Sequence, residues 1–160
     1  MDVNRVSQGQ RIAAIAGVLL LIDLWMNWYS VNVSDRALQL ARGAGITVPD
    51  FSASAWQVFS YTDILLAITA LVAIGAAAAT ASGTALPVRL TPIIAPLAGV
   101  MTLLVLYRIV NQPGPNNVIN VEWGAYLGLI LVAVVTYGGM RAASETTEVS
   151  APVAPAAPAA

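Results

Sequence analysis

The chain has 160 residues, of which 58% are hydrophobic and only 9% are charged. Soluble domains of this size carry about a quarter of their residues as charged side chains, so the composition excludes an ordinary soluble domain and predicts an integral membrane protein. The formal net charge is −1 and the few charges are scattered, which argues against a nucleic-acid partner.

Four apolar stretches are long enough to cross a bilayer, which takes about 20 residues. They cover residues 12–29, 55–81, 90–110 and 121–140. The first ends in bulky residues without a small-residue cleavage pattern, so we expect a retained helix and not a signal peptide. The sequence therefore predicts an all-α, four-helix transmembrane bundle over residues 12–141, preceded by a short N-terminal segment at residues 1–11.

Four spans place both termini on the same side of the membrane, and the arginines indicate which side. Arg5, Arg11, Arg89 and Arg141 flank the spans on the side of the termini, against Arg36, Arg42 and Arg108 on the other. Because cations are enriched on the cytoplasmic side, this small excess predicts a multi-pass protein of the plasma membrane with cytoplasmic termini.

The longest predicted loop covers residues 30–54, on the side away from the termini. Within it, Ser34 is a suitable N-cap, residues 35–42 form two turns of an amphipathic helix, and Gly43 is a natural stop. We expect this short helix to lie along the membrane surface. At the other end of the chain, residues 142–160 become Ala- and Pro-rich, which predicts a disordered tail.

Four tryptophans are the candidate interface aromatics. Trp25 and Trp28 end the first predicted span, Trp56 opens the second and Trp123 opens the fourth. Alternating topology brings all four to the same, external surface. Because aromatic belts normally form at both membrane surfaces, this asymmetry predicts that the external surface has a further role.

Four ionisable residues are predicted to meet in the same half of the membrane. They are Asp23, Asp63, Arg108 and Glu122. Charged groups in a bilayer are costly, so each one is a functional candidate. On a helical first span, Asn27 and Ser30 would continue the face of Asp23, while Asp63 would lie about two turns into the second span.

Two interpretations of these residues remain open. In the first, Arg108 is a structural centre whose five donors hold carboxylates from several helices together. In the second, Asp23 or Asp63 is the protonatable site of a proton- or cation-coupled transporter. One arginine neutralises only one carboxylate fully, so an unpaired buried aspartate would have to be protonated or face water.

Pairs of small residues four positions apart occur in two of the spans. Gly124 and Gly128 form a GxxxG pair in the fourth span, and Ala13 and Gly17 form a similar pair in the first. Such pairs let helix backbones approach closely. We expect them to pack inside the bundle, with dimerisation as the alternative.

The chemistry of an enzyme is not apparent in the sequence. The chain contains no Cys and no His, which excludes disulfides, thiolate and imidazole catalysis and nearly every transition-metal site. No serine has a plausible base beside it, and no Gly-rich loop follows a strand. We therefore expect a non-enzymatic protein with no catalytic residues, no metal and no cofactor.

Three segments resemble a known group of proteins. They are SAWQVFSYTDILL at residues 54–66, YRIV at 107–110 and VEWGAYLG at 121–128. Together they are similar to small four-helix membrane proteins of actinobacteria with no assigned function, over most of residues 12–140. The resemblance implies a four-helix bundle in an actinobacterial plasma membrane and supplies no activity. Asp63, Arg108 and Glu122 lie inside the resembling segments, and Asp23 lies outside them.

These observations lead to two hypotheses about function. The first is an accessory or scaffold subunit of a membrane or envelope complex, which binds a membrane-protein partner or itself through its external face. The second is a small proton- or cation-coupled transporter or channel that uses Asp23 and Asp63. The bilayer is the expected surrounding in both cases.

Overall fold

The computed structural model describes residues 3–31, 33–47, 52–58, 61–84, 90–112 and 119–149. Most of them are helical. The helices are η1 (Val3–Arg5), α1 (Gln8–Asp23), α2 (Asp35–Gly43), α3 (Ala55–Val58), α4 (Thr62–Ser82), α5 (Thr91–Val110) and α6 (Trp123–Val149). The strands are β1 (Asn27–Val31), β2 (Ser52–Ser54) and β3 (Ile119–Val121).

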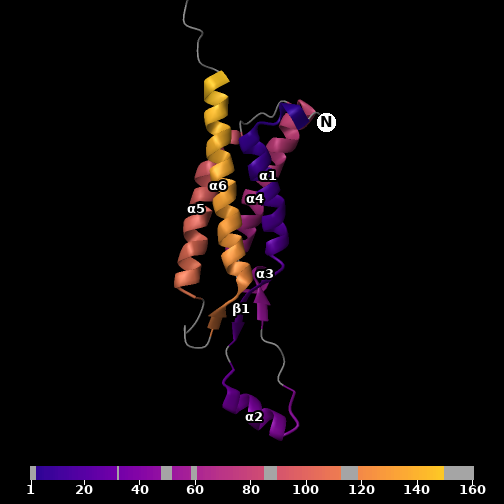
Figure 1. Cartoon of the computed structure of the whole chain (residues 1–160), viewed down its shortest axis with the longest axis vertical. Helices are drawn as coiled ribbons and strands as arrows, with labels where there is room; N and C mark the ends of the chain where they lie inside the picture. Colours follow the sequence, from indigo (N-terminus) through magenta and orange to yellow (C-terminus); the bar gives the residue numbers. More distant parts are fainter. Residues whose placement is uncertain are drawn as a thin grey trace, which may run out of the picture.

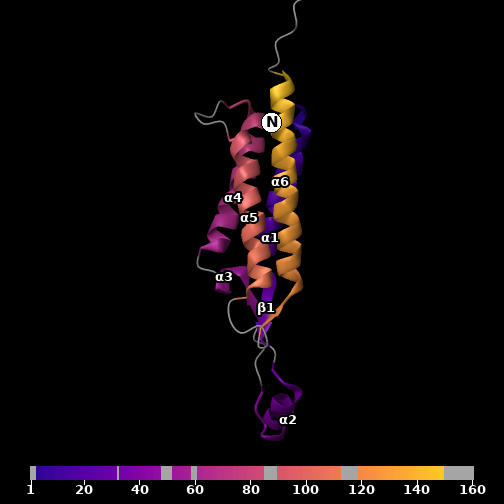
Figure 2. The same ribbon diagram turned by 90° about the vertical axis from the view of Figure 1, so that its left-hand side faces the viewer.

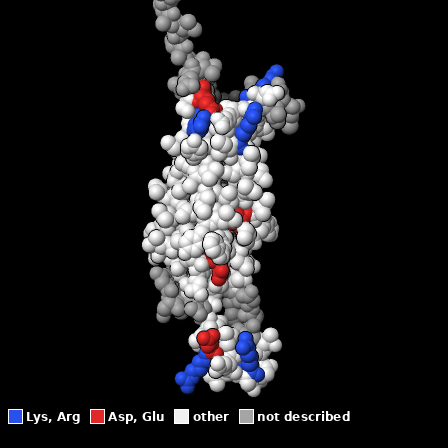
Figure 3. Space-filling view, in the orientation of Figure 1, with Lys and Arg blue, Asp and Glu red and all other residues white. Residues whose placement is uncertain are grey.

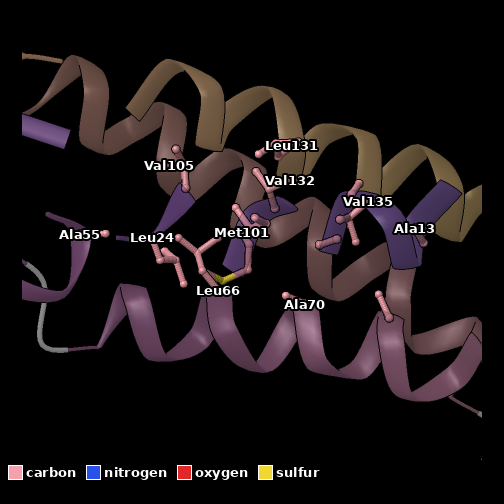
Figure 4. Close-up of a cluster of buried hydrophobic side chains, with 14 of the residues drawn as sticks. Ala13, Leu24, Ala55, Leu66, Ala70, Met101, Val105, Leu131, Val132 and Val135 are labelled. Atoms are coloured by element: carbon pink, nitrogen blue, oxygen red, sulfur yellow. The ribbon is translucent and has the colours of Figure 1, made fainter. Parts of the chain in front are cut away.

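Helices α1, α4, α5 and α6 form a four-helix bundle, as predicted. Helix α1 packs against α4 and α6, and α5 packs against the same two helices (Figures 1 and 2). Helices α4, α5 and α6 are each long and apolar enough to cross a membrane, whereas α1, with 16 residues, is shorter. The bundle core is a column of aliphatic side chains that includes Leu24, Leu66, Met101, Val105 and Val132 (Figure 4).

Glycines let the helices of the bundle touch through their backbones. A Cβ atom at Gly138 of α6 would lie 2.6 Å from the backbone nitrogen of Ala13, and one at Gly17 would lie 3.1 Å from the carbonyl oxygen of Ala70. Large side chains at these glycine positions would push the helices apart. Ala13 and Gly17 are therefore used for packing inside the bundle, as expected.

The first predicted span is wrong at both ends. Helix α1 begins at Gln8, because Ser7 and Gln10 form a capping box in which each side chain bonds the other's backbone N–H. It ends at Asp23, where the carbonyl oxygen accepts from the backbone N–H of Met26 at 2.8 Å and from the indole of Trp28 at 3.2 Å. These two donors replace the i+4 partner that a continuing helix would need.

A small sheet follows, which an all-α fold class does not include. Strand β1 lies in the centre, with β2 and β3 antiparallel on its two sides. The sheet closes the end of the bundle opposite the described N-terminal residues (Figure 1). The first three residues of its central strand belong to the predicted first span, and the last two belong to the predicted loop at residues 30–54.

The other predicted spans differ in their ends. Residues 55–81 are divided into α3 and α4, and residues 59–60 between them lie outside the described residues. Span 90–110 agrees with α5 to within a residue. Span 121–140 begins later, because Val121 belongs to β3, and α6 continues to Val149. The predicted disordered tail is therefore wrong for residues 142–149, and residues 150–160 lie outside the described part.

The longer α6 is explained by contacts with the start of α1. Glu145 accepts a hydrogen bond from the backbone N–H of Gly9, at the positive end of the α1 dipole. Arg141 lies 3.5 Å from Glu145 and donates to the side chain of Gln8. The last turns of α6 are thereby fixed to α1.

Helix α2 forms where it was predicted, and it stops slightly later. The hydroxyl of Ser34 caps its start by accepting from the backbone N–H of Ala37. The left-handed stop residue is Gly45, with φ of +69°, and not Gly43, which is the last helical residue. No residue of α2 is buried, and the helix lies beyond the sheet, apart from the bundle (Figure 1).

Candidate functional site

The four candidate ionisable residues lie at the sheet end of the bundle. Asp23 ends α1, Asp63 is in the first turn of α4, Arg108 is in the last turn of α5, and Glu122 directly precedes α6. They therefore lie at one end of the bundle, while their location in the same half of a membrane stays a prediction. The predicted polar stripe from Asp23 through Asn27 and Ser30 is wrong, because the last two belong to β1.

Asp23 is the most enclosed of these groups. Its side chain is 1% exposed, and neither carboxylate oxygen has a hydrogen-bond partner. Gly128 of α6 lies directly against it: a Cβ there would be 2.7 Å from Oδ2 of Asp23 and 2.4 Å from the ring of Trp28. The GxxxG glycine thus provides the space that the carboxyl and the indole occupy, so this pair also packs inside the chain.

Asp63 is a second buried carboxyl at a similar level of the bundle. It is 3% exposed, and its Oδ1 atom has no hydrogen-bond partner. Helices α1 and α4 run in opposite directions, and Gly17 of α1 lies against Ala70 of α4. Asp23 comes six residues after Gly17, and Asp63 comes seven residues before Ala70. The two aspartates therefore lie within about one helical turn of each other along the bundle axis. The first turn of a helix favours a negative charge, which makes burial of Asp63 less costly.

Glu122 and Arg108 belong to the junction between bundle and sheet. Glu122 is half-buried and accepts a hydrogen bond from the hydroxyl of Ser30, and its backbone N–H donates to the carbonyl of Trp28 at 2.8 Å. The hydroxyl of Tyr29 donates to the carbonyl of Arg108 at 3.1 Å. Because neither carboxylate oxygen of Asp23 is hydrogen-bonded, Arg108 does not hold Asp23 in the manner of a structural centre.

Three of the four candidate tryptophans are exposed at this end, in two separate aromatic pairs. The rings of Trp25 and Trp56 lie 6.2 Å apart, and those of Trp123 and Tyr126 lie 6.5 Å apart. Trp28 does not belong to this surface, because it is 0% exposed and packs against Gly124 and Gly128. Its assignment to a contact surface is therefore wrong, and its role is to join β1 to α6.

Gln10 is a polar core residue that the sequence analysis did not select. Its amide nitrogen donates to the hydroxyls of Thr80 on α4 and Thr91 on α5, both at 3.2 Å. One side chain of α1 thus bonds two other helices at the end of the bundle away from the sheet. The capping-box spacing of Ser7 and Gln10 was the signal in the sequence that could have found it.

No protein-family model, no curated protein and no solved structure matches this chain.

Proposed function

We propose that the chain is an integral membrane protein with four spans, formed by α1, α4, α5 and α6. The long sides of the bundle expose large apolar residues, among them Ile15, Leu19, Ile68, Leu71, Val100, Leu103 and Ile130. On the face drawn in Figure 3, arginines lie at the two ends of the molecule and the middle is mostly uncharged. An apolar band of this size between charged ends is typical of a lipid-facing surface.

Helix α1 is the span that requires a separate argument. Its 16 residues extend about 24 Å, which is less than the hydrocarbon thickness of about 30 Å. Its outward side chains, such as Val18 and Ile22, are apolar like those of the longer helices. Strand β1 continues the chain beyond α1 with Trp28 and Tyr29 buried, which supports α1 as a complete crossing. The small excess of arginines on the side of the termini supports cytoplasmic termini.

Within this membrane, the proposed function is binding of another membrane or envelope protein, as an accessory or scaffold subunit. The observation that carries this proposal is the exposure of α2. Its nine residues form a capped helix with no buried side chain, held beyond the sheet on the side away from the termini. A short isolated helix is marginal in water, and α2 gains little from packing because none of its residues is buried, so a partner is the expected source of its stability.

Site-specific photo-cross-linking in the native membrane tests this proposal. A photoreactive residue replaces Leu40 on α2, which is 69% exposed, or Leu103 on the apolar side of α5, which is 68% exposed. We expect Leu40 to form a stoichiometric adduct with one protein, while the matched Leu103 position reacts with lipid. Equal protein adducts at both positions, or none at Leu40, would show that α2 is not the binding element.

A small transporter or channel is the second candidate, favoured by the unpaired carboxyl of Asp23. Buried unpaired carboxyls in membrane bundles are typical of proton and cation pathways. In liposomes with an imposed proton gradient, Asp23→Asn or Asp63→Asn should then abolish flux while leaving expression intact. Flux at the parent level in both variants would exclude these carboxyls from a pathway.

A further inference from the structure

The surroundings of Asp23 leave few ways to compensate its burial. Leu20, one turn before it on α1, and Leu24, directly after the end of the helix, are both 0% exposed. The indole N–H of Trp28, which comes from β1, donates to the backbone oxygen of Asp23 at 3.2 Å. From α6, Gly128 presents only its Cα hydrogens to Oδ2. An ionised carboxylate without donors in such a setting costs several kcal/mol.

The other titratable groups at this end do not remove the difficulty. Asp63 on α4 and Glu122 directly before α6 are acids, and their negative charges would repel a negative charge on Asp23. The hydroxyl of Tyr29 on β1 donates its hydrogen bond to the carbonyl of Arg108. Arg108 on α5 is the cation at this end of the bundle, and it makes no hydrogen bond to either oxygen of Asp23. A metal cation would need about six oxygen ligands, whereas a proton needs one.

We propose that Asp23 is a proton-binding site, in which the carboxyl is held as a neutral acid between α1, β1 and α6. Gly128 makes the site possible, because any larger residue there would overlap both the carboxyl and the indole. This site rests on the proposed membrane location but is independent of a protein partner at α2. The cross-linking experiment can therefore refute a partner at α2 without refuting the proton site at Asp23, and the reverse also holds.

Infrared spectroscopy of the full-length protein in lipid vesicles tests the proposal directly. A neutral carboxylic acid has a carbonyl stretching band that carboxylates and amides lack. We expect one such band at neutral pH in the parent protein, a frequency shift when aspartate carboxyls carry ¹³C, and loss of the band in Asp23→Asn. The matched variant Asp63→Asn should keep the band. Asparagine has the shape of the neutral acid, so the first variant should fold.

Two results would overturn the proposal. One is the absence of a carboxylic-acid band from the parent protein at neutral pH, which requires no variant and so does not depend on folding. The other is a band that persists in Asp23→Asn and disappears in Asp63→Asn, which would assign the proton to α4. A band that titrates away only at alkaline pH, with the bundle still helical by circular dichroism, would agree with a proton bound at Asp23.

Discussion

At the scale of single residues, Gly128 has little freedom to change. A methyl group there would lie 2.4 Å from the Trp28 ring and 2.7 Å from Oδ2 of Asp23, both well inside contact distance. Gly128→Ala should therefore lower the free energy of unfolding by about 1–3 kcal/mol, as overpacking does. Reversible unfolding of the protein in mixed detergent micelles, followed by circular dichroism, measures this change.

Gly75 provides the matched control for that experiment. It also lies within a long helix, α4, but a Cβ at this position would meet nothing within 4 Å. Gly75→Ala should raise the stability by about 0.5–1 kcal/mol, because alanine loses less backbone entropy in a helix. Similar effects of the two substitutions would show that Gly128 does not provide space for Asp23 and Trp28.

Substitutions of Trp28 and Trp123 compare the stability contributions of a buried and an exposed tryptophan. Trp28 is 0% exposed and Trp123 is 82% exposed, although both lie near the start of α6. Trp28→Ala should cost about 3–5 kcal/mol and unfold much of the protein at ordinary temperature. Trp123→Ala should stay within about 0.5 kcal/mol of the parent. Equal losses on thermal unfolding would contradict the position of Trp28 between β1 and α6.

At the scale of elements, Gln10 holds one end of the bundle together. Gln10→Leu removes the hydrogen bonds to Thr80 and Thr91, together with the capping-box bond from the backbone N–H of Ser7, while keeping a similar volume. Interhelical hydrogen bonds in membranes contribute about 0.6 kcal/mol each on average, so the expected loss is about 1–2 kcal/mol. Ser144→Ala is the control, because its hydroxyl bonds only within α6. Unfolding titrations in sodium dodecyl sulfate compare the two variants, and equal midpoints would exclude this role of Gln10.

The sequence predicted the elements whose limits depend on local composition. Helix α5 begins at Thr91-Pro92 and ends where the sequence becomes polar at Asn111, and α2 has its cap and stop residues within a few positions, so both were placed closely. The end of α1 was missed, since the apolar run continues beyond Asp23 and hydropathy does not register an indole that bonds a helix carbonyl. The last turns of α6 were missed because their support comes from Gly9, far away in the chain.

For the candidate site, the sequence predicted which residues lie at the same end of the bundle, but not which groups they contact. Alternating spans were enough to bring Asp23, Asp63, Arg108 and Glu122 to one end of the bundle. Their partners were not predictable, because the bond from Ser30 to Glu122 depends on the register of β1 against β3. Burial of Trp28 likewise depends on a glycine of the last helix, which no local pattern connects with the end of the first.

At the scale of the whole molecule, the proposed four-span topology makes a prediction that needs no functional assay. The chain has no cysteine, so single substitutions can be labelled individually. A membrane-impermeant maleimide should label Gln39→Cys on α2 in intact cells, but should label Asn4→Cys and Ser144→Cys only after permeabilisation. If Asn4→Cys and Gln39→Cys were labelled from the same side, α1 would not be a span.

The central position of β1 in the sheet has a consequence for biogenesis. Strand β1 leaves the ribosome with the first quarter of the chain, yet β3 and the glycines that receive Trp28 come only with the last helix. Until α6 is inserted, the nascent chain exposes an unpaired strand edge and a tryptophan without its cavity. The β1–β2 pair precedes this step, and the last segment of the chain completes the three-stranded sheet and encloses Trp28. A chain truncated before β3 should therefore be retained by chaperones and degraded by proteases.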